Sequence, residues 1–497
     1  MDYQLLFEHF RQTHLNHQEQ ASWSAQRRLH ECLRSAIRHG NLPARTRLLS
    51  SRVLAQELGV ARNTVVYAYE QLVTEGYLIT DRRGSIVASI ISDHAALPIS
   101  RVSSKRSAGL SRRALSLLPF PVAAELSGGF APGVPSLADF PIALWRRLLD
   151  RTWRALGTSQ LSYAGAAGEL PLRAAIADHL RASRGADCTA SQVFITEGTQ
   201  SSLDLCARAF ADADDIVWLE NPGYSGAHTA FRTAQLNTIG IKVDAEGIAP
   251  GACDWLRRPP KLIYVTPSHQ YPTGSVLSLA RRISLIRQAA EHGALIIEDD
   301  YDSEFRHDGP PLAAMQGQMP DAPVLYLGTF SKTMFPALRI GYIVVPKHLV
   351  DAFTALVAKS TLRGRAADQL CLAKFIGDGH FALHLRRMRR LYRQRRDALV
   401  AALELHLGDI ANIYGASAGM HLALRFDDLA LDDVSISEAA LVQGIVVPAL
   451  SAHSVGRRMH GWCGLVLGYA QVPVEQISPM VLKLAVIMRE AVEQQSK

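Results

Sequence analysis

Residues 324–333 read VLYLGTFSKT, an apolar run that ends directly in small hydroxyl residues and a lysine. Similar runs, apolar on both faces, recur along the chain as VFITEG (193–198), IVWLENPG (216–223), KLIYVTP (261–267), ALIIEDD (294–300) and RIGYIVVP (339–346). Helical patterns such as 172–182 and 201–210 separate these runs. The alternation predicts an α/β fold, with a mostly parallel sheet covered by helices on both faces.

Candidate functional side chains follow four of these predicted strands. Because an open α/β sheet binds ligands beyond the carboxyl ends of its strands, we expect these side chains to lie close together. After the run VFITEG, the backbone N–H groups of Gly198, Thr199 and Gln200 begin a helix, and the N-terminus of a helix suits a phosphate. The ends of the other strands supply Tyr224, Asp299, Tyr301 and Lys332.

A phosphate site, an aromatic ring, a carboxylate, a phenol and a lysine are together what pyridoxal 5'-phosphate (PLP) requires of a protein. Lys332 is the one lysine of nine that follows a buried strand among hydroxyl residues. The plainer alternative is a surface lysine, the usual location of this residue, and the position of Lys332 argues against it. Asp299 and Asp300 could also bind a metal, but no third ligand stands at a recognisable spacing. We therefore expect PLP and no metal.

The first ninety residues predict three helices and a hairpin. The helices are expected over 24–40, within SSRVLAQELGV (capped by Ser50 or Ser51 and stopped by Gly59) and over 61–76, and two strands, 77–80 and 85–90, flank the basic tip DRRG. The last two helices, joined by a tight turn, form a helix-turn-helix. The alternative is a small helical decoration with solvated charges. The candidate DNA contacts are Arg45, Arg52, Arg62, Asn63, Thr64 and Arg83.

The distribution of charge supports a polyanion-binding segment at the N-terminus. Residues 1–120 hold 16 Lys and Arg against 9 Asp and Glu, whereas residues 121–497 hold 37 of each kind. All of the formal net charge of +7 therefore lies in the first part of the chain. A stretch rich in proline, serine and basic residues follows, and it predicts a linker. The expected organisation is a DNA-binding domain over 1–90, a linker over 91–126 and an α/β domain over 127–497, with a smaller α+β subdomain over 364–497.

Length and composition exclude several other classes of protein. A chain of 497 residues, 48% apolar and 20% charged, is expected to form two or three globular domains. Its apolar runs fall short of the ~18 residues of a membrane helix, and its start does not resemble a secretory signal, so we expect a cytoplasmic protein. The six cysteines never stand at CxxC spacing, and hence predict neither a zinc site nor a disulfide framework.

Two sets of motifs resemble known families. Residues 29–88 contain LxxSR, LAxxLGVxRNTV, YxxLxxEGYL and RxGxxV, and they resemble the winged helix-turn-helix of the GntR family. Leu49 is a departure, because proline is usual at that position. Residues from about 128 onward resemble fold-type I, aspartate-aminotransferase-like proteins, and the order of the two domains resembles the MocR subfamily of GntR regulators.

The resemblance implies a role for each candidate residue. Lys332 would be the Schiff-base lysine, Asp299 the partner of the pyridine nitrogen, Tyr301 a contact to the 3'-oxygen and Tyr224 the stacking ring. Tyr163, in a YxxxxGxxxLR segment, would reach the cofactor of a second subunit, which implies a homodimer. The residues expected around the phosphate or the cofactor entrance are Gly198, Thr199, Thr329, Ser331 and Arg339.

One departure from the resemblance concerns catalysis. Aminotransferases usually hold the substrate carboxylate with an arginine in a strand similar to RLSFA, and this chain has Val466 there. Arg457 or Arg458 could substitute, although a solvated basic pair is the simpler interpretation. We expect a PLP-dependent regulator that binds a double-stranded operator and senses PLP or an amino-acid-like effector, with little or no transaminase activity. The alternatives are an active aminotransferase with a DNA-binding appendage, and a regulator whose large domain only dimerises.

Overall fold

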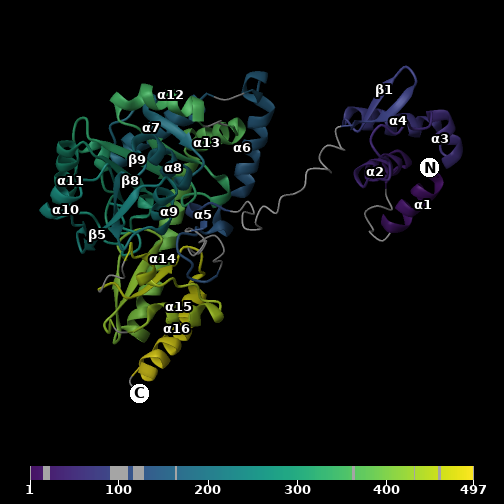
Figure 1. Ribbon diagram of the computed structural model, residues 1–497. Coiled ribbons are helices and arrows are strands. Elements are labelled where there is room, and N and C mark those ends of the chain that lie inside the picture. Colours follow the sequence, from purple (N-terminus) through teal and green to yellow (C-terminus); the bar gives the residue numbers. More distant parts are fainter. Residues whose placement is uncertain are drawn as a thin grey trace. The chain divides into compact units, whose positions relative to one another are not determined.

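The computed structural model describes residues 2–14, 23–89, 110–115, 128–162, 165–360, 364–429, 431–456 and 461–495. The chain forms two compact units, Met1–Gly109 and Leu110–Lys497, and each is described by itself (Figure 1). Among the residues described, no helix combines the length and the apolar character needed to cross a membrane.

The N-terminal unit consists of helices and one hairpin around a single apolar core. The side chain of Ser24 caps one helix by accepting from the backbone N–H of Arg27, and Ser50 caps another by accepting from that of Val53. Gly59 ends the latter helix in the left-handed region, at φ 65°. The elements are α1 (Tyr3–His14), α2 (Ala25–Arg38), α3 (Ser51–Leu58), α4 (Arg62–Thr74), β1 (Leu78–Asp81) and β2 (Gly84–Val87).

Helix α1 is an addition to the three helices that the sequence pattern predicted. It packs beside α3, where the backbone N–H of Tyr3 donates to Glu57 Oε1 at 3.2 Å and the Tyr3 ring is buried. At the departure, Leu49, the backbone carbonyl accepts a hydrogen bond of 2.9 Å from the Tyr69 hydroxyl, which ties this turn to α4. The unit is thus a winged helix-turn-helix with one further helix.

The larger unit is built on an eight-stranded sheet in the order β3-β10-β9-β8-β7-β4-β5-β6. The strands from β9 to β5 pair in parallel, while β10 is antiparallel to both of its neighbours and β6 is antiparallel to β5. The predicted mostly parallel sheet is confirmed. The strands are β3 (Val193–Thr196), β4 (Ile216–Asn221), β5 (Asn237–Asp244), β6 (Gly247–Ile248), β7 (Leu262–Val265), β8 (Leu295–Asp300), β9 (Val324–Thr329) and β10 (Gly341–Val344).

Helices surround this sheet, and Figure 1 shows several of them around β5, β8 and β9. Separate apolar clusters lie against the sheet, one with Phe194 and Phe231 and another with Trp218 and Trp255. The helices are α5 (Arg112–Leu115), α6 (Ile142–Ala155), α7 (Leu170–Arg184), α8 (Thr199–Phe210), α9 (Ser225–Thr233), α10 (Ala252–Arg257), α11 (Leu279–His292), α12 (Val350–Ser360) and α13 (Ala366–Gly377).

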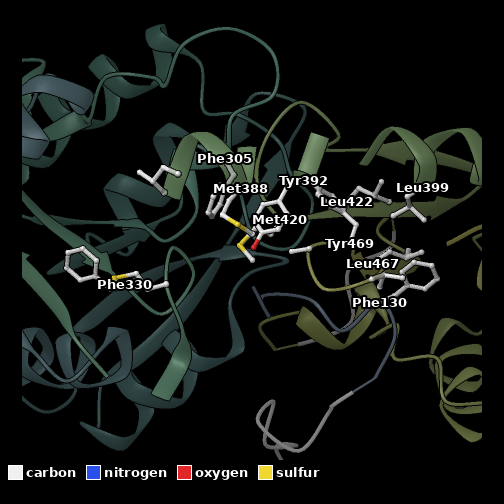
Figure 2. Packing of buried hydrophobic residues seen from close by; sticks show 14 of the residues in the cluster. Phe130, Phe305, Phe330, Met388, Tyr392, Leu399, Met420, Leu422, Leu467 and Tyr469 are labelled. Carbon is white, nitrogen blue, oxygen red and sulfur yellow. The ribbon is translucent and has the colours of Figure 1, made fainter. Parts of the chain in front are cut away.

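The C-terminal part adds a three-stranded antiparallel sheet, in the order β11-β12-β13, to the same unit. Its core is continuous with that of the larger sheet, and Figure 2 shows Phe305, Met388, Tyr392 and Met420 gathered in this shared cluster. The elements are α14 (His380–Leu407), β11 (Ala411–Tyr414), β12 (His421–Phe426), α15 (Asp433–Val442), β13 (Gly464–Gly468) and α16 (Val474–Gln495).

Most of the stretch predicted to be a linker, 91–126, lies outside the described residues. Residues 110–115 are described, and they contain the short helix α5. The Ser111 hydroxyl accepts from the backbone N–H of Ala114 at 3.1 Å, and Arg113 donates to Gln235 Oε1 at 3.2 Å. This part of the expected linker therefore belongs to the larger unit.

Candidate functional site

Lys332 lies just beyond β9 and is half-buried among charged and aromatic groups. Its Nζ donates to the Gly133 carbonyl oxygen at 2.7 Å. Gly133 has φ +73°, and a Cβ added there would lie 3.0 Å from the lysine Nζ, so glycine suits the position. Burial lowers the pKa of Lys332, against the opposing influence of Asp302 and Asp299. A lowered pKa favours the neutral form of an amine, which is the nucleophilic form.

Asp299 is the last residue but one of β8 and has one carboxylate oxygen without a partner among the described residues. Its Oδ2 accepts a 2.8 Å hydrogen bond from the Tyr264 hydroxyl, whereas Oδ1 is buried and makes none. Burial raises the pKa of Asp299 to about 7. Buried acceptors in proteins are nearly always hydrogen-bonded, so the Asp299 Oδ1 is expected to accept from a bound group. The protonated nitrogen of a pyridine ring is such a donor.

Lys332 and Asp299 line one cavity of about 140 Å³ at the carboxyl ends of the strands. Tyr224 and Tyr271 meet edge to face with ring centroids 5.9 Å apart, and Tyr271 also contacts Tyr301 at 6.2 Å. The Tyr301 hydroxyl donates to the His269 carbonyl oxygen at 2.9 Å. The other lining residues are Pro132, Gly133, Thr199, Tyr264, Thr266, Asp302, Met420 and His421.

The N-terminus of α8 opens beside this cavity. Gly198 precedes the helix at φ +89°, a conformation that favours glycine, and Thr199 lines the cavity. The Arg339 guanidinium lies 3.6 Å from the position of a Cβ built on Gly198. Ser331 donates its backbone N–H to Thr329 Oγ1 at 3.2 Å, which fixes the turn before the lysine. Helix amides, a guanidinium and hydroxyls are the groups that bind a phosphate.

Three buried side chains beside the cavity are of the kinds that bind metals: His269, Asp302 and His421. Both nitrogens of His269 are already engaged, Nδ1 with Asp302 Oδ2 at 3.1 Å and Nε2 with the Gly415 carbonyl oxygen at 3.2 Å. His421 is 1% exposed, its Nε2 has no hydrogen-bond partner in the described part of the chain, and burial lowers its pKa. The nitrogens of His269 are thus already engaged with Asp302 and Gly415, whereas the His421 Nε2 remains without a partner among the described residues.

Val466 occupies the place where the resemblance leads one to expect an arginine. It lies on β13 opposite Ala423 of β12, and both side chains are wholly buried in a small apolar cluster with Leu450. No guanidinium is therefore available from this position. The two alternatives considered from the sequence, Arg457 and Arg458, lie outside the described residues, as does Tyr163.

The structure thus brings together Lys332, Asp299, Tyr301, Tyr224 and Thr199, with Gly198 and Arg339 at the helix end. Sequence reasoning missed the contributions of Tyr264, Asp302, Gly133 and His421. Tyr264 stands in the predicted strand KLIYVTP, and Asp302 follows the predicted strand ALIIEDD by two residues, so a signal existed for both. Gly133 and His421 reach the cavity from distant segments, and no local pattern identifies them.

In the N-terminal unit, most of the predicted DNA contacts are exposed. Arg62 and Asn63 begin α4 and Arg52 lies in α3, all with exposed side chains. Arg45 and Arg83 are exposed on the segments around the hairpin. Thr64 differs, because it is 7% exposed and its side chain contributes to the interior of the unit. Burial of this kind places Thr64 among the residues that support α4 rather than those that reach DNA.

These features define a class: a winged helix-turn-helix joined to an aminotransferase-like body. Residues 25–87 match the family described as "Bacterial regulatory proteins, gntR family", and residues 136–463 match "Aminotransferase class I and II". The structure of LysN, the α-aminoadipate aminotransferase of Thermus thermophilus in complex with N-(5'-phosphopyridoxyl)-L-leucine, is similar with a TM-score of 0.70 and 26% identity. The similarity covers 78% of this chain and 98% of that one.

Similarity to regulators extends over nearly the whole chain. The probable rhizopine catabolism regulatory protein MocR of Rhizobium meliloti is 41% identical over 90% of each chain. The pyridoxine biosynthesis transcriptional regulator PdxR of Corynebacterium glutamicum is 33% identical over 89% of this chain and 91% of that one. The chain therefore belongs to the MocR-type transcription regulators of the GntR family.

Proposed function

We propose that this regulator binds PLP at Lys332 and that occupation of the cavity controls its binding to operator DNA. The observation that carries the proposal is the buried Asp299 Oδ1, which lacks a donor among the described residues in a cavity that also holds a lysine. A pyridine nitrogen and an aldehyde on one ring are complementary to these two groups. Bound PLP supplies an electrophilic carbonyl carbon and an electron-withdrawing ring.

The remaining residues have roles that follow from their positions. Tyr224 would stack on the ring, and Tyr301, held by its hydrogen bond to the His269 carbonyl, would contact the 3'-oxygen. Tyr264 orients the Asp299 carboxylate through Oδ2 and leaves Oδ1 for the ring. The phosphate would be held by Gly198, Thr199, Thr329, Ser331 and Arg339.

We propose PLP itself as the effector, with an amino-acid-like molecule as the second candidate. Position 466 is a valine in a buried apolar cluster, so it supplies no guanidinium that could select an α-carboxylate, while the lysine, the carboxylate and the aromatic rings that PLP needs line the cavity. The same absence argues against rapid transamination. Sustained production of oxoacid by the purified protein, mixed with amino donors and 2-oxoglutarate, would contradict this part of the proposal.

A homodimer is the expected assembly. The resemblance assigns Tyr163 to the cofactor of a second subunit, and a twofold-symmetric protein suits a DNA site with two half-sites. Sedimentation at micromolar concentration should give the mass of two chains. A monomer that still retains PLP would contradict the assignment of Tyr163.

Absorbance measures the first step of the proposal directly. Titration of the cofactor-free protein with PLP should produce a visible band that saturates at one PLP per chain. A colourless protein at saturating PLP would instead favour the alternative in which the large unit only dimerises.

A further inference from the structure

Helix α14 contains the most concentrated positive charge in the larger unit. Residues 386–396 read RRMRRLYRQRR, with seven arginines and no acidic residue. The unit as a whole has balanced charge, since residues 121–497 hold 37 basic and 37 acidic side chains. Such a run is commonly a solvated helix face, so its surroundings decide whether it forms a binding surface.

The surroundings differ on the two sides of the helix. On one side, Arg387 donates to Asp139 Oδ1 at 3.0 Å and Arg395 approaches Asp139 Oδ2 at 3.5 Å. On that side of the helix, the Asp139 carboxylate therefore offsets part of the positive charge. Arg395 also donates to the Ala470 carbonyl and is nearly buried, which marks it as a structural residue.

The other side forms a hollow of about 520 Å³ that no acidic side chain of the described residues lines. Arg389 and Arg393 donate to the carbonyl oxygens of Glu304 and His307, and these bonds hold the guanidinium groups without neutralising them. Arg386 and Arg390 are exposed and make no ion pair with any described residue. The lining is Arg306, Leu383, Arg386, Arg389, Arg390 and Arg393.

We propose that this arginine-lined hollow, the α14 hollow, binds the phosphate backbone of double-stranded DNA. Residues 386, 389, 390 and 393 repeat at helical spacing over two turns, which is about 10 Å at ~1.5 Å per residue. Duplex DNA carries one charge per ~1.7 Å of its axis, so an array of this length meets several phosphates at once. A single small phosphate would engage only part of it.

Duplex DNA is favoured over other polyanions because the chain is a DNA-binding regulator. The winged helix-turn-helix and the α14 hollow belong to one chain, so DNA bound by the first is presented to the second at high effective concentration. Contacts of this kind add affinity and salt dependence, and they carry no sequence information.

The test is the binding of the full chain to a labelled duplex of about 60 base pairs of random sequence, a probe that reports backbone contacts alone. The variant R386Q/R390Q removes two charges from exposed side chains that make no ion pair among the described residues. The matched control is R146Q/R147Q, which removes two exposed charges from α6 of the same unit.

We expect R386Q/R390Q to bind about 10-fold or more weakly at ~0.1 M salt, and the slope of log K against log salt to fall in magnitude by about 2, near 0.9 per lost contact. The control should match the wild type. Wild-type affinity and slope in R386Q/R390Q, or an equal loss in the control, would overturn the proposal. A changed sedimentation coefficient in R386Q/R390Q would also overturn it, because the hollow would then be a contact between copies of the chain.

Discussion

The predicted DNA-binding face of the N-terminal unit, formed by Arg45, Arg52, Arg62, Asn63 and Arg83, and the PLP cavity of the larger unit assemble their functional groups in opposite ways. The exposed arginines of the N-terminal unit lie in a turn, on adjacent helices and at the tip of a hairpin within 40 residues of sequence, from Arg45 to Arg83, and their side chains are in water. The cavity gathers buried and half-buried groups from strand ends and from β12, across nearly 300 residues from Gly133 to His421. Substitutions should therefore affect binding alone on the DNA-binding face, and stability as well as binding in the cavity.

The largest effect is expected at Lys332. Replacement by alanine removes the amine that lines the cavity, so reduction with borohydride in the presence of PLP should label the wild type and leave Lys332→Ala unlabelled. The exposed Lys347 provides the control, because Lys347→Ala should be labelled as the wild type is. A label on a peptide without Lys332 would show that the site is elsewhere.

Asp299→Asn should separate stability from function. Burial raises the pKa of Asp299 from its ordinary value near 4 to about 7, so the folded protein holds this proton more tightly than the unfolded chain does. The resulting stabilisation is fully present below about pH 4 and is lost as the pH rises through about 7. The amide cannot ionise. At pH 8 the cofactor-free variant should be more stable than the wild type by about 2–4 kcal/mol, and the difference should shrink towards pH 5.

The same variant should bind PLP more weakly, because an amide gives the pyridine nitrogen no ionic partner. Chemical denaturation at pH 5 and 8, with and without PLP, measures both effects. Equal stability of the two cofactor-free proteins at pH 8 would contradict a buried, ionised Asp299.

On the DNA-binding face, Arg62→Gln should cost about 1–3 kcal/mol of operator affinity if the guanidinium reads a guanine. Because the side chain is exposed, the free energy of unfolding and the uptake of PLP should remain those of the wild type. A fluorescence binding isotherm over a range of salt concentrations measures the loss. Unchanged affinity for the operator would remove Arg62 from the contact surface.

The smallest effect is expected at a helix cap. The Ser50 hydroxyl accepts a hydrogen bond of 3.4 Å from the backbone N–H of Val53. Ser50→Ala should therefore lower the free energy of unfolding of the N-terminal unit by about 1 kcal/mol. Ser51 is the matched control, because it is already within the helix and does not cap it. Hydrogen exchange of the α3 amides should distinguish the two, and equal protection in both variants would argue against the cap.

The contrast between the two regions also explains which features of the fold and of the site could be predicted from the sequence. The helix-turn-helix was predictable because its caps, its turn at Gly59 and its apolar spacing are all local. The sheet and the groups at its strand ends were predictable because parallel strands bring their carboxyl ends to one edge. Local patterns gave no sign of α1, whose packing depends on Glu57, or of Gly133 and His421, which reach the cavity only through the tertiary fold.

Thr64 illustrates the limit within a motif that was otherwise recognised. Its place next to Asn63 at the start of α4 suggested a DNA contact, but the helical rotation directs it inward, where it is 7% exposed. Position in a motif identifies the helix that enters a groove, whereas the face of that helix depends on its packing against α2 and α3.

The central claim is that occupation of the cavity alters DNA binding by the other unit. A ligand can shift such an equilibrium only through different affinities for the two states. The decisive measurement is a titration of the cofactor-free protein, bound to promoter DNA, with PLP, using Lys332→Ala as the control. We predict that DNA affinity or bending changes with the same midpoint as the PLP absorbance band, and that Lys332→Ala shows no such change. An absorbance band that saturates while DNA affinity and bending stay constant would contradict the account.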